Sequence, residues 1–201
     1  MSSVAMIAGS FALWAVVHSI LASSWMKALV RRAFGPGTAR WYRLFFVSFA
    51  VLTLTPILLA VAVLPDRALY AVGAPWRWVM MVGQAGAVVA LIISVAQAGV
   101  MHFLGLAQVL AGDPSRTGTL QVNGVYRYVR HPLYLFGVIL VGLTPSMSLN
   151  RAAAYACMTL YFIIGSIHEE ALLEAEFGES YARYRVQVPR FFPLPGRQYE
   201  G

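Results

Sequence analysis

Apolar stretches about as long as a bilayer is thick recur along this chain, and they constrain its fold more than any other feature. Three long ones occupy residues 4–22, 44–64 and 79–100. A helix needs roughly 17–25 mostly apolar residues to cross the hydrocarbon core of a membrane. Charged residues make up only 11% of the chain, against about 25% in soluble domains. The sequence therefore predicts an all-α, polytopic membrane helix bundle.

Two shorter apolar pieces follow, at residues 133–143 and 152–167. They fit either two spanning helices or a tight hairpin, so we expect about five transmembrane segments. We expect one integral membrane domain over residues 1–201, with N-terminal helices at 1–100 and a functional core at 101–195. The chain turns polar from His168 onward, which predicts a cytoplasmic helical tail.

The cations are distributed unevenly between the two ends of the predicted helices. The net charge is +7, but the basic residues form no soluble basic face, so we expect no nucleic-acid partner. Three cations, Arg67, Arg77 and Arg151, fall on one side, and twelve fall on the other: Lys27, Arg31, Arg32, Arg40, Arg43, Arg116, Arg127, Arg130, Arg183, Arg185, Arg190 and Arg197. An excess of Lys and Arg marks the cytoplasmic side. The count predicts that the N-terminus lies outside and the C-terminus in the cytoplasm. We expect the membrane to be a bacterial inner membrane.

Cysteine and histidine usage gives little sign of a metal site. The single cysteine, Cys157, excludes an internal disulfide and a zinc–thiolate cluster. The four histidines, His18, His102, His131 and His168, are too far apart in sequence to show ligand spacing. We expect no metal, and we expect His18 to face a neighbouring helix rather than lipid.

The segment GVYRYVRHPLY places cations directly before an apolar run. Pro132 suits the first turn of a helix, where its missing N–H would be unpaired in any case. A helix start beside Arg130 and His131 is a ready site for an anion. A second interpretation is topological, with Arg127 and Arg130 anchoring the membrane boundary and an interfacial belt formed by Tyr126, Tyr128 and Tyr134.

Two acidic residues, Glu169 and Glu170, directly follow the last apolar piece. Carboxylates so close to the bilayer are costly unless they are hydrated or paired, so they are functional candidates. The alternative is an ordinary cytoplasmic helix. For the later acids we prefer a solvated helix face: Glu174, Glu176 and Glu179.

The tail segment ESYARYRVQVPRFFP predicts a short helix that ends before Pro189. Tyr181, Tyr184 and Val188 recur on one face at helical spacing. This aromatic face suits packing against the membrane, or a lid over a bound cofactor.

Taken together, these motifs resemble a known family. GVYRYVRHPLY, then EE, then EFGESYARYRVQVPRFFP resembles the isoprenylcysteine carboxyl methyltransferase superfamily over residues 105–193. That superfamily includes phospholipid N-methyltransferases and bacterial methanethiol S-methyltransferases. HSILAS followed by a lysine, at residues 18–27, with RWYRLFF after it, looks more like the bacterial thiol branch.

The resemblance implies a cytoplasmic-side pocket for S-adenosylmethionine within residues 101–195. The residues that it assigns to cofactor binding are Gly105, Leu106, Tyr126, Arg130, His131, Pro132, Tyr134, Glu169, Glu170, Tyr181 and Tyr184, with Arg130 and His131 also expected to act in catalysis. LGLAQVL lacks the tryptophan and serine that often follow the family's glycine.

The chemistry of these residue types agrees with that assignment. Carboxylates suit the ammonium and hydroxyl groups of the cofactor, a cationic helix start suits its carboxylate, and aromatic rings suit its sulfonium. Methyl transfer is an in-line displacement that needs alignment and exclusion of water rather than a metal. We expect a methyltransferase acting on the thiol or carboxylate of an apolar or thiol-bearing acceptor in or near the bilayer, such as a small thiol or isoprenylcysteine. The alternatives are a phospholipid N-methyltransferase and a non-enzymatic accessory or transport protein.

Overall fold

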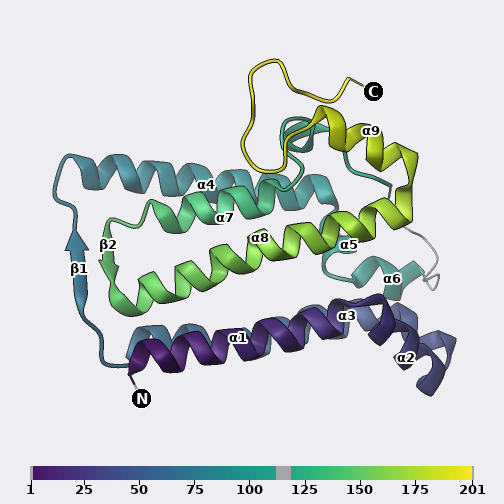
Figure 1. Ribbon diagram of the computed structural model, residues 1–201, viewed down its shortest axis with the longest axis horizontal. Helices are drawn as coiled ribbons and strands as arrows, with labels where there is room; N and C mark the ends of the chain where they lie inside the picture. The colour runs from purple at the N-terminus through teal and green to yellow at the C-terminus, as the bar shows by residue number, and fades with distance from the viewer. Residues whose placement is uncertain (1, 112–118, 201) are drawn as a thin grey trace. The chain divides into compact units, whose positions relative to one another are not determined.

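A computed structural model describes residues 2–111 and 119–200 of the chain (Figure 1). The predicted cytoplasmic cation Arg116 lies outside the described residues. In chain order the elements are α1 (Ser3–Ala22), α2 (Ser24–Phe34), η1 (Pro36–Thr38), α3 (Ala39–Val63), β1 (Ala68–Ala71), α4 (Trp76–Ala98), α5 (Val100–Phe103), α6 (Leu106–Ala111), η2 (Gly124–Arg127), α7 (Pro132–Gly142), β2 (Ser146–Ser148), α8 (Leu149–Phe177) and α9 (Glu179–Gln187).

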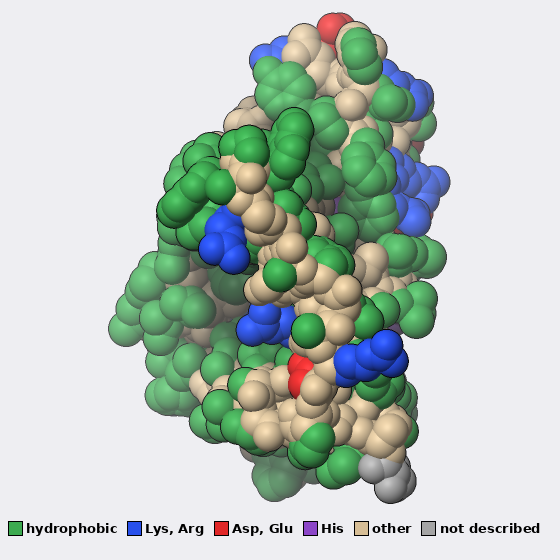
Figure 2. All heavy atoms as spheres, turned by 90° about the vertical axis from the view of Figure 1, so that its left-hand side faces the viewer, with side chains coloured by type: hydrophobic (Ala, Val, Ile, Leu, Met, Phe, Trp, Pro, Cys, Tyr) green, Lys and Arg blue, Asp and Glu red, His purple; other side chains and the backbone are tan. Residues whose placement is uncertain are grey.

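Four of these helices, α1, α3, α4 and α8, are long and apolar enough to cross a membrane. Their outward side chains are apolar, as at Leu52, Val63 and Ile92, which are 71%, 76% and 64% exposed. Figure 2 shows one face of the molecule, where hydrophobic side chains far outnumber charged ones. Apolar surface on this scale suits lipid rather than water. The predicted helical membrane bundle is confirmed.

The helix α7 is shorter than a span. It has 11 residues, about 16 Å of helix, against a hydrocarbon core of about 30 Å. The helix α8 has 29 residues and extends ten residues beyond the predicted end of the last apolar piece at Ile167. It continues because HEEALLEAEF consists largely of good helix formers. Glu169 and Glu170 therefore lie inside a helix rather than after one.

The chain forms two compact units, each built from separate stretches of sequence. The first combines Met1–Arg67, Gly99–Gly118 and Ser148–Cys157, and the second combines Ala68–Ala98, Thr119–Met147 and Met158–Gly201. The boundaries predicted at residues 1–100 and 101–195 stay a prediction.

In the first unit, α1 packs against α3. The indole Nε1 of Trp14 donates to Thr53 Oγ1 over 3.1 Å, and the Tyr42 hydroxyl donates to the Leu21 carbonyl over 2.6 Å. The His18 ring lies 4.7 Å from the Trp14 ring and 4.4 Å from the Phe46 ring. His18 thus faces a neighbouring helix, as predicted.

The connector after the first apolar stretch contains the helix α2, which the sequence analysis did not predict. Ser23 separates it from α1 with an extended backbone (φ −65°, ψ 149°). The Ser23 hydroxyl donates to the Ile20 carbonyl and accepts from the Met26 N–H. One serine therefore ends one helix and caps the next, and α2 bends away from α1 (Figure 1).

In the second unit, α4 packs against α7. Gln84 Nε2 donates to the Leu140 carbonyl over 2.9 Å. The strands β1 and β2 form a two-stranded sheet that the sequence analysis also did not predict. The Val72 N–H extends this pairing to the Pro145 carbonyl over 2.8 Å. The sheet therefore holds the segment before α4 beside the segment before α8, at one end of the unit (Figure 1).

Candidate functional site

The helix α7 begins where the sequence predicted. Pro132 is its first residue and His131 its N-cap. The Leu135 N–H donates to the His131 carbonyl over 3.1 Å. Both Pro132 and His131 are buried. The predicted helix start at Pro132 is confirmed, and it fixes His131 at the mouth of the helix.

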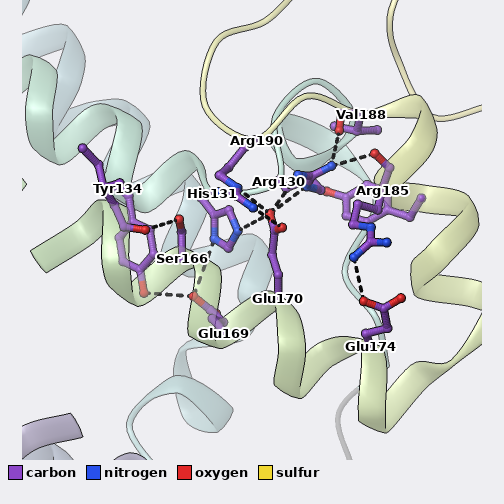
Figure 3. A network of polar contacts seen from close by, with 12 residues as sticks. Arg130, His131, Tyr134, Ser166, Glu169, Glu170, Glu174, Arg185, Val188 and Arg190 are labelled. Carbon is purple, nitrogen blue, oxygen red and sulfur yellow. Dashed lines mark hydrogen bonds and ion pairs between the residues drawn. The ribbon is translucent and has the colours of Figure 1, made fainter. Parts of the chain in front are cut away.

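The Glu170 carboxylate is the centre of a cluster of charged side chains, drawn in Figure 3. Its Oε1 accepts from Arg130 Nε at 3.0 Å and from His131 Nε2 at 3.1 Å. Arg190 Nη2 lies 2.7 Å from Oε2. The Glu170 side chain is only 5% exposed, so this carboxylate is buried but surrounded by positive donors. A buried charge is tolerable under that condition.

Glu169, the preceding residue, has a different environment. Its side chain is 48% exposed. The Tyr134 hydroxyl donates to Glu169 Oε2 over 2.9 Å, and His131 Nδ1 lies 3.5 Å from the same oxygen. The two neighbouring glutamates therefore differ: one is enclosed by cations, and the other opens to the surroundings.

The His131 imidazole bridges the two carboxylates, with one ring nitrogen toward each (Figure 3). Its ring stacks on the Tyr134 ring at 5.4 Å and 8°. Burial by itself would lower the pKa of His131, but its hydrogen bonds to the Glu169 and Glu170 carboxylates outweigh burial and raise that pKa above its usual value. The protonated imidazolium is thus favoured between the two carboxylates.

The C-terminal segment after α9 is hydrogen-bonded to the two residues that precede α7. The Arg130 N–H donates to the Pro189 carbonyl over 3.0 Å, and the His131 N–H donates to the Arg190 carbonyl over 3.1 Å. Arg130 Nη1 also donates to the Val188 carbonyl over 2.9 Å. The Arg130 side chain therefore links the segment after α9 to α8, because its guanidinium donates both to the Val188 carbonyl and to the Glu170 carboxylate.

The helix α9 places Tyr181 and Tyr184 on its inner face. They are 0% and 2% exposed and form a core with Val188. The Tyr184 hydroxyl donates to the Tyr126 carbonyl over 2.6 Å. Among the described residues, the buried Tyr181 hydroxyl has no hydrogen-bond partner. Burial raises the pKa of both phenols, so both remain neutral donors at neutral pH.

The end of α4 positions the segment that carries Tyr126. The Tyr126 hydroxyl donates to the carbonyl of fully buried Ser94 over 3.3 Å. Gln97 Oε1 accepts from the Val125 N–H over 2.9 Å, and a Cβ at Gly124 would clash with the Gln97 amide. Burial, with Glu169 nearby, raises the pKa of Tyr126 to about 12. Gln97 and Gly124 thus hold the Tyr126 turn in place.

Sequence reasoning missed two residues of this site, Arg190 and Gln97. Arg190 was counted only as a cytoplasmic cation, although it stands in the motif VPRFFP. Gln97 is a lone amide near the end of an apolar helix, and that position was its available signal.

Gly105 has a structural explanation in the first unit. Gly105 has φ +82°, and a Cβ there would lie 2.5 Å from the Leu44 backbone nitrogen. Close packing against α3 therefore accounts for the glycine. Leu106 begins α6. Their contact with a cofactor stays a prediction.

A shallow hollow of about 350 Å³ lies on the outer face of α9, lined by Ala182, Arg183, Val186 and Gln187. These positions face away from Tyr181 and Tyr184 on the helix. The hollow has an apolar surface and none of the carboxylates described above. The glutamate and histidine cluster is therefore the better candidate for the functional site.

Comparisons with known proteins point to one family. The family described as phospholipid methyltransferase matches residues 79–180, which include Gln97, Tyr126, the start of α7 and both glutamates. No solved structure matches the chain at a significant level. The resemblance predicted from the motifs is confirmed.

Individual relatives are methyltransferases. The chain is 37% identical over 73 residues to the methanethiol S-methyltransferase of Crocosphaera subtropica, a match covering 36% of this chain and 29% of the relative. It is 32% identical over 116 residues to that of Pseudomonas deceptionensis, covering 53% and 44%. It is 31% identical over 123 residues to the protein-S-isoprenylcysteine O-methyltransferase of Schizosaccharomyces pombe, covering 51% and 52%. The chain thus spans about half the length of these relatives or less.

Proposed function

Because the chain belongs to the phospholipid methyltransferase family, we propose that it transfers a methyl group from S-adenosylmethionine to an acceptor at the membrane. The acceptor class is a thiol or carboxylate, as in a small thiol or an isoprenylcysteine. The observation that carries the proposal is the cluster of His131, Glu169 and Glu170 at the mouth of an apolar helix. The family match, the charged side chains of the cluster and the adjacent apolar helix α7 all support the proposal at this one place.

The side chains of the cluster fit the cofactor's polar groups. The Glu169 carboxylate is half-exposed, so it is the acceptor better suited to the cofactor's ammonium group. Glu170 already accepts from Arg130, His131 and Arg190, which suits it to holding the site together. The buried Tyr181 hydroxyl, which has no partner among the described residues, supplies a donor that a polar ligand would satisfy.

The start of α7 supplies the complementary charge. A helix N-terminus with adjacent cations favours a carboxylate, and Pro132 with His131 forms that N-terminus. The rings of Tyr126 and Tyr134 suit a positively charged sulfonium. When bound, S-adenosylmethionine supplies a methyl group activated by that sulfonium.

The contacts support different roles for the two predicted catalytic residues, Arg130 and His131. Arg130 donates to Glu170, Arg185 and Val188, so under the proposal it is a positioning residue. His131 touches both carboxylates and holds Glu169 in the orientation needed for binding. Tyr181 and Tyr184 form the inner face of a cover that excludes water, which favours displacement chemistry.

The orientation proposed for the chain follows its cations. The sequence predicts that twelve of the fifteen Lys and Arg residues lie on the cytoplasmic side, which supports a cytoplasmic site and C-terminus and an outer N-terminus. S-adenosylmethionine is a cytoplasmic cofactor, so this orientation and the proposed activity support each other. The inner membrane of a bacterium suits both.

The first test is binding of the product S-adenosylhomocysteine, measured by calorimetry on detergent-purified protein. We expect micromolar binding by the wild type. We expect Glu169→Gln to weaken it about tenfold or more, because a hydrogen bond to a charged group is lost. Glu176→Gln is the matched control, since Glu176 is an exposed carboxylate on the same helix, and it should bind like the wild type.

Wild-type binding then justifies assays with methanethiol, prenylcysteine and phospholipid acceptors, each followed by methyl transfer from labelled cofactor. A folded wild type that binds no S-adenosylhomocysteine in either detergent or lipid nanodiscs would overturn the proposed activity. Equal binding by the Glu169→Gln variant would overturn the role assigned to Glu169.

A further inference from the structure

The helix α2 (Ser24–Phe34) has an apolar side and a basic side. At 100° per residue, the basic arc is Lys27, Arg31 and Arg32, with Ala28 between them. The apolar arc consists of Trp25, Met26, Leu29, Val30, Ala33 and Phe34. None of its residues is buried, and Trp25, Leu29 and Phe34 are 64%, 45% and 76% exposed. Neither arc is therefore buried within the described part of the chain.

The position of α2 in the chain keeps it beside the bilayer. It lies between α1 and α3, both of which are long and apolar enough to span. Its 11 residues give about 16 Å of helix, too short to cross a core of about 30 Å. Ser23, which has an extended backbone, separates it from α1, and Gly35 (φ +87°) follows it. The helix is therefore free to lie in the plane of the membrane surface, with its apolar arc at the boundary between headgroups and acyl chains.

Along the described chain from residue 2 to residue 111, the charged side chains on either side of α2 are almost all positive. Between residues 2 and 111 the only acidic residue is Asp66, which follows the far end of α3. The 25 residues of α3 place it about 37 Å along the helix from Arg40. That distance is several Debye lengths, each about 8 Å at physiological ionic strength. Asp66 therefore does not offset the positive charge of α2.

Arg40, at the start of α3, extends the basic arc. Its guanidinium carbon lies 5.5 Å from the centre of the exposed Trp41 ring. Tryptophan rings favour the headgroup region of a membrane, and a guanidinium over such a ring remains able to bind phosphate through its N–H groups. This pair repeats on α3 the combination of aromatic ring and arginine found on α2.

We propose that α2 together with Arg40 is a binding surface for anionic phospholipids. The apolar arc lies among the upper acyl chains, and Arg31, Arg32 and Arg40 hold the phosphates of headgroups that carry net negative charge. A zwitterionic headgroup brings its own cation, so it gains less from a surface without carboxylates. This surface is separate from the proposed methyltransferase site, since no residue of that cluster lies on α2.

The experiment is a lipid competition followed by native mass spectrometry. Purified full-length protein is equilibrated with equal amounts of phosphatidylglycerol and phosphatidylcholine, and the two bound lipids are counted. We expect the wild type to retain phosphatidylglycerol preferentially. Arg31→Gln with Arg32→Gln should reduce that preference about tenfold or more, because each basic residue contributes several-fold to binding an anionic surface.

The matched control removes the same charge elsewhere. Arg67 and Arg77 are exposed and lie in the segment between α3 and the first turn of α4. Arg67→Gln with Arg77→Gln should leave the preference within about twofold of the wild type, since neither residue belongs to the α2 surface. An equal loss in the control would reduce the effect to overall charge and overturn the proposal, as would a wild type without preference. Displacement of the bound lipid by inorganic phosphate would indicate a free-anion site instead.

A second measurement tests the placement of α2 without altering its charge. The chain has one cysteine, Cys157, so a Cys157→Ala background allows single spin labels at Leu29 and Ala28. In nanodiscs, the label at Leu29 should be accessible to oxygen, which concentrates in the bilayer. The label at Ala28, on the basic side, should be accessible to a water-soluble nickel chelate. Equal exposure of both labels to the chelate would show that α2 stands off the membrane, and would overturn the proposal.

Discussion

Two carboxylates accept several hydrogen bonds each: Asp66, which lies against the start of α8, and Glu170, which lies in the C-terminal half of α8. The donors to the two carboxylates differ in kind. Asp66 Oδ1 accepts from the backbone N–H groups of Arg67 at 2.7 Å and Asn150 at 3.0 Å. Glu170 accepts from the side chains of Arg130, His131 and Arg190. The first is exposed and the second is buried.

The difference between the donors separates a structural cap from a candidate site. Backbone N–H groups at a helix start need an acceptor in any helix, so Asp66 does what a capping residue does. Asn150 completes that cap by donating to the Leu64 and Pro65 carbonyls. Burying the Glu170 carboxylate together with the Arg130 and His131 side chains carries a desolvation cost that apolar packing would avoid. This cost is consistent with the role proposed for the cluster in cofactor binding.

The largest expected effect is that of Glu170→Gln. Removing this charge leaves Arg130, which is 9% exposed, without its counter-charge. We expect a loss of unfolding free energy of about 3 kcal/mol and a loss of S-adenosylhomocysteine binding. Thermal unfolding in detergent and calorimetry measure the two effects.

The control is Glu174→Gln on the same helix. Glu174 pairs with Arg185 over 2.6 Å, but both side chains are more than 40% exposed. Exposed pairs contribute about 0–1 kcal/mol, so this variant should melt close to the wild type. Equal losses of unfolding free energy and of S-adenosylhomocysteine binding in both variants would contradict the larger role predicted for Glu170.

Arg190→Gln should have a smaller effect of the same kind. Arg190 donates to both oxygens of Glu170, but its side chain is 34% exposed and Arg130 remains. We expect a loss of about 1–2 kcal/mol, with binding weakened rather than abolished. Arg183→Gln, an exposed arginine on α9, is the matched control. If Arg190→Gln melts and binds like Arg183→Gln, then Arg130 and His131 suffice to hold Glu170.

The pH dependence of stability tests the bridge made by His131. Because the pKa of His131 is raised in the folded protein, its stabilising contribution is complete below the ordinary value near 6.5. The contribution is lost as the pH rises through the higher folded-state pKa. Melting temperatures from about pH 5.5 to 8.5 should therefore fall more steeply with pH in the wild type than in His131→Gln.

The control for this titration is His168→Gln, since His168 is exposed on the same helix as the glutamates. Its melting profile should follow the wild type. Parallel profiles for His131→Gln and the wild type would contradict the bridge.

Asp66→Asn should have the smallest effect, because asparagine keeps an oxygen acceptor for the backbone donors. The Ser148 hydroxyl, and then the backbone N–H groups, lower the pKa of Asp66 despite the opposing effect of desolvation. The stability from its charge is therefore present above the ordinary value near 3.8 and is lost as the pH falls through the folded-state value. The variant should melt slightly below the wild type at neutral pH and approach it in acid.

Cofactor binding separates the two carboxylates most directly. Asp66→Asn should bind S-adenosylhomocysteine like the wild type, whereas Glu170→Gln should not. A loss of binding in Asp66→Asn comparable to that in Glu170→Gln would mean that the capping end of α8 also governs the site.

Much of the fold could be predicted because its signals are local. The three long apolar stretches gave α1, α3 and α4, and Pro132 marked the start of α7 because proline suits a helix's first turn. The spacing of Tyr181, Tyr184 and Val188 predicted one face of α9, which proved to be buried. The sheet of β1 and β2 was missed because its pairing depends on residues about 75 positions apart, as in the Tyr70 hydroxyl bond to the Thr144 carbonyl.

The sequence by itself determined the membrane class, the three long apolar helices and the family, because these depend on composition, periodicity and motifs read along the chain. It also identified Glu169 and Glu170 together as candidate functional residues. Only the tertiary structure decided that the two are unlike, since Arg190 reaches Glu170 from a segment 20 residues further along while Glu169 remains half-exposed. The environment of a carboxylate is set by donors from distant segments, and those meet only when the chain has folded.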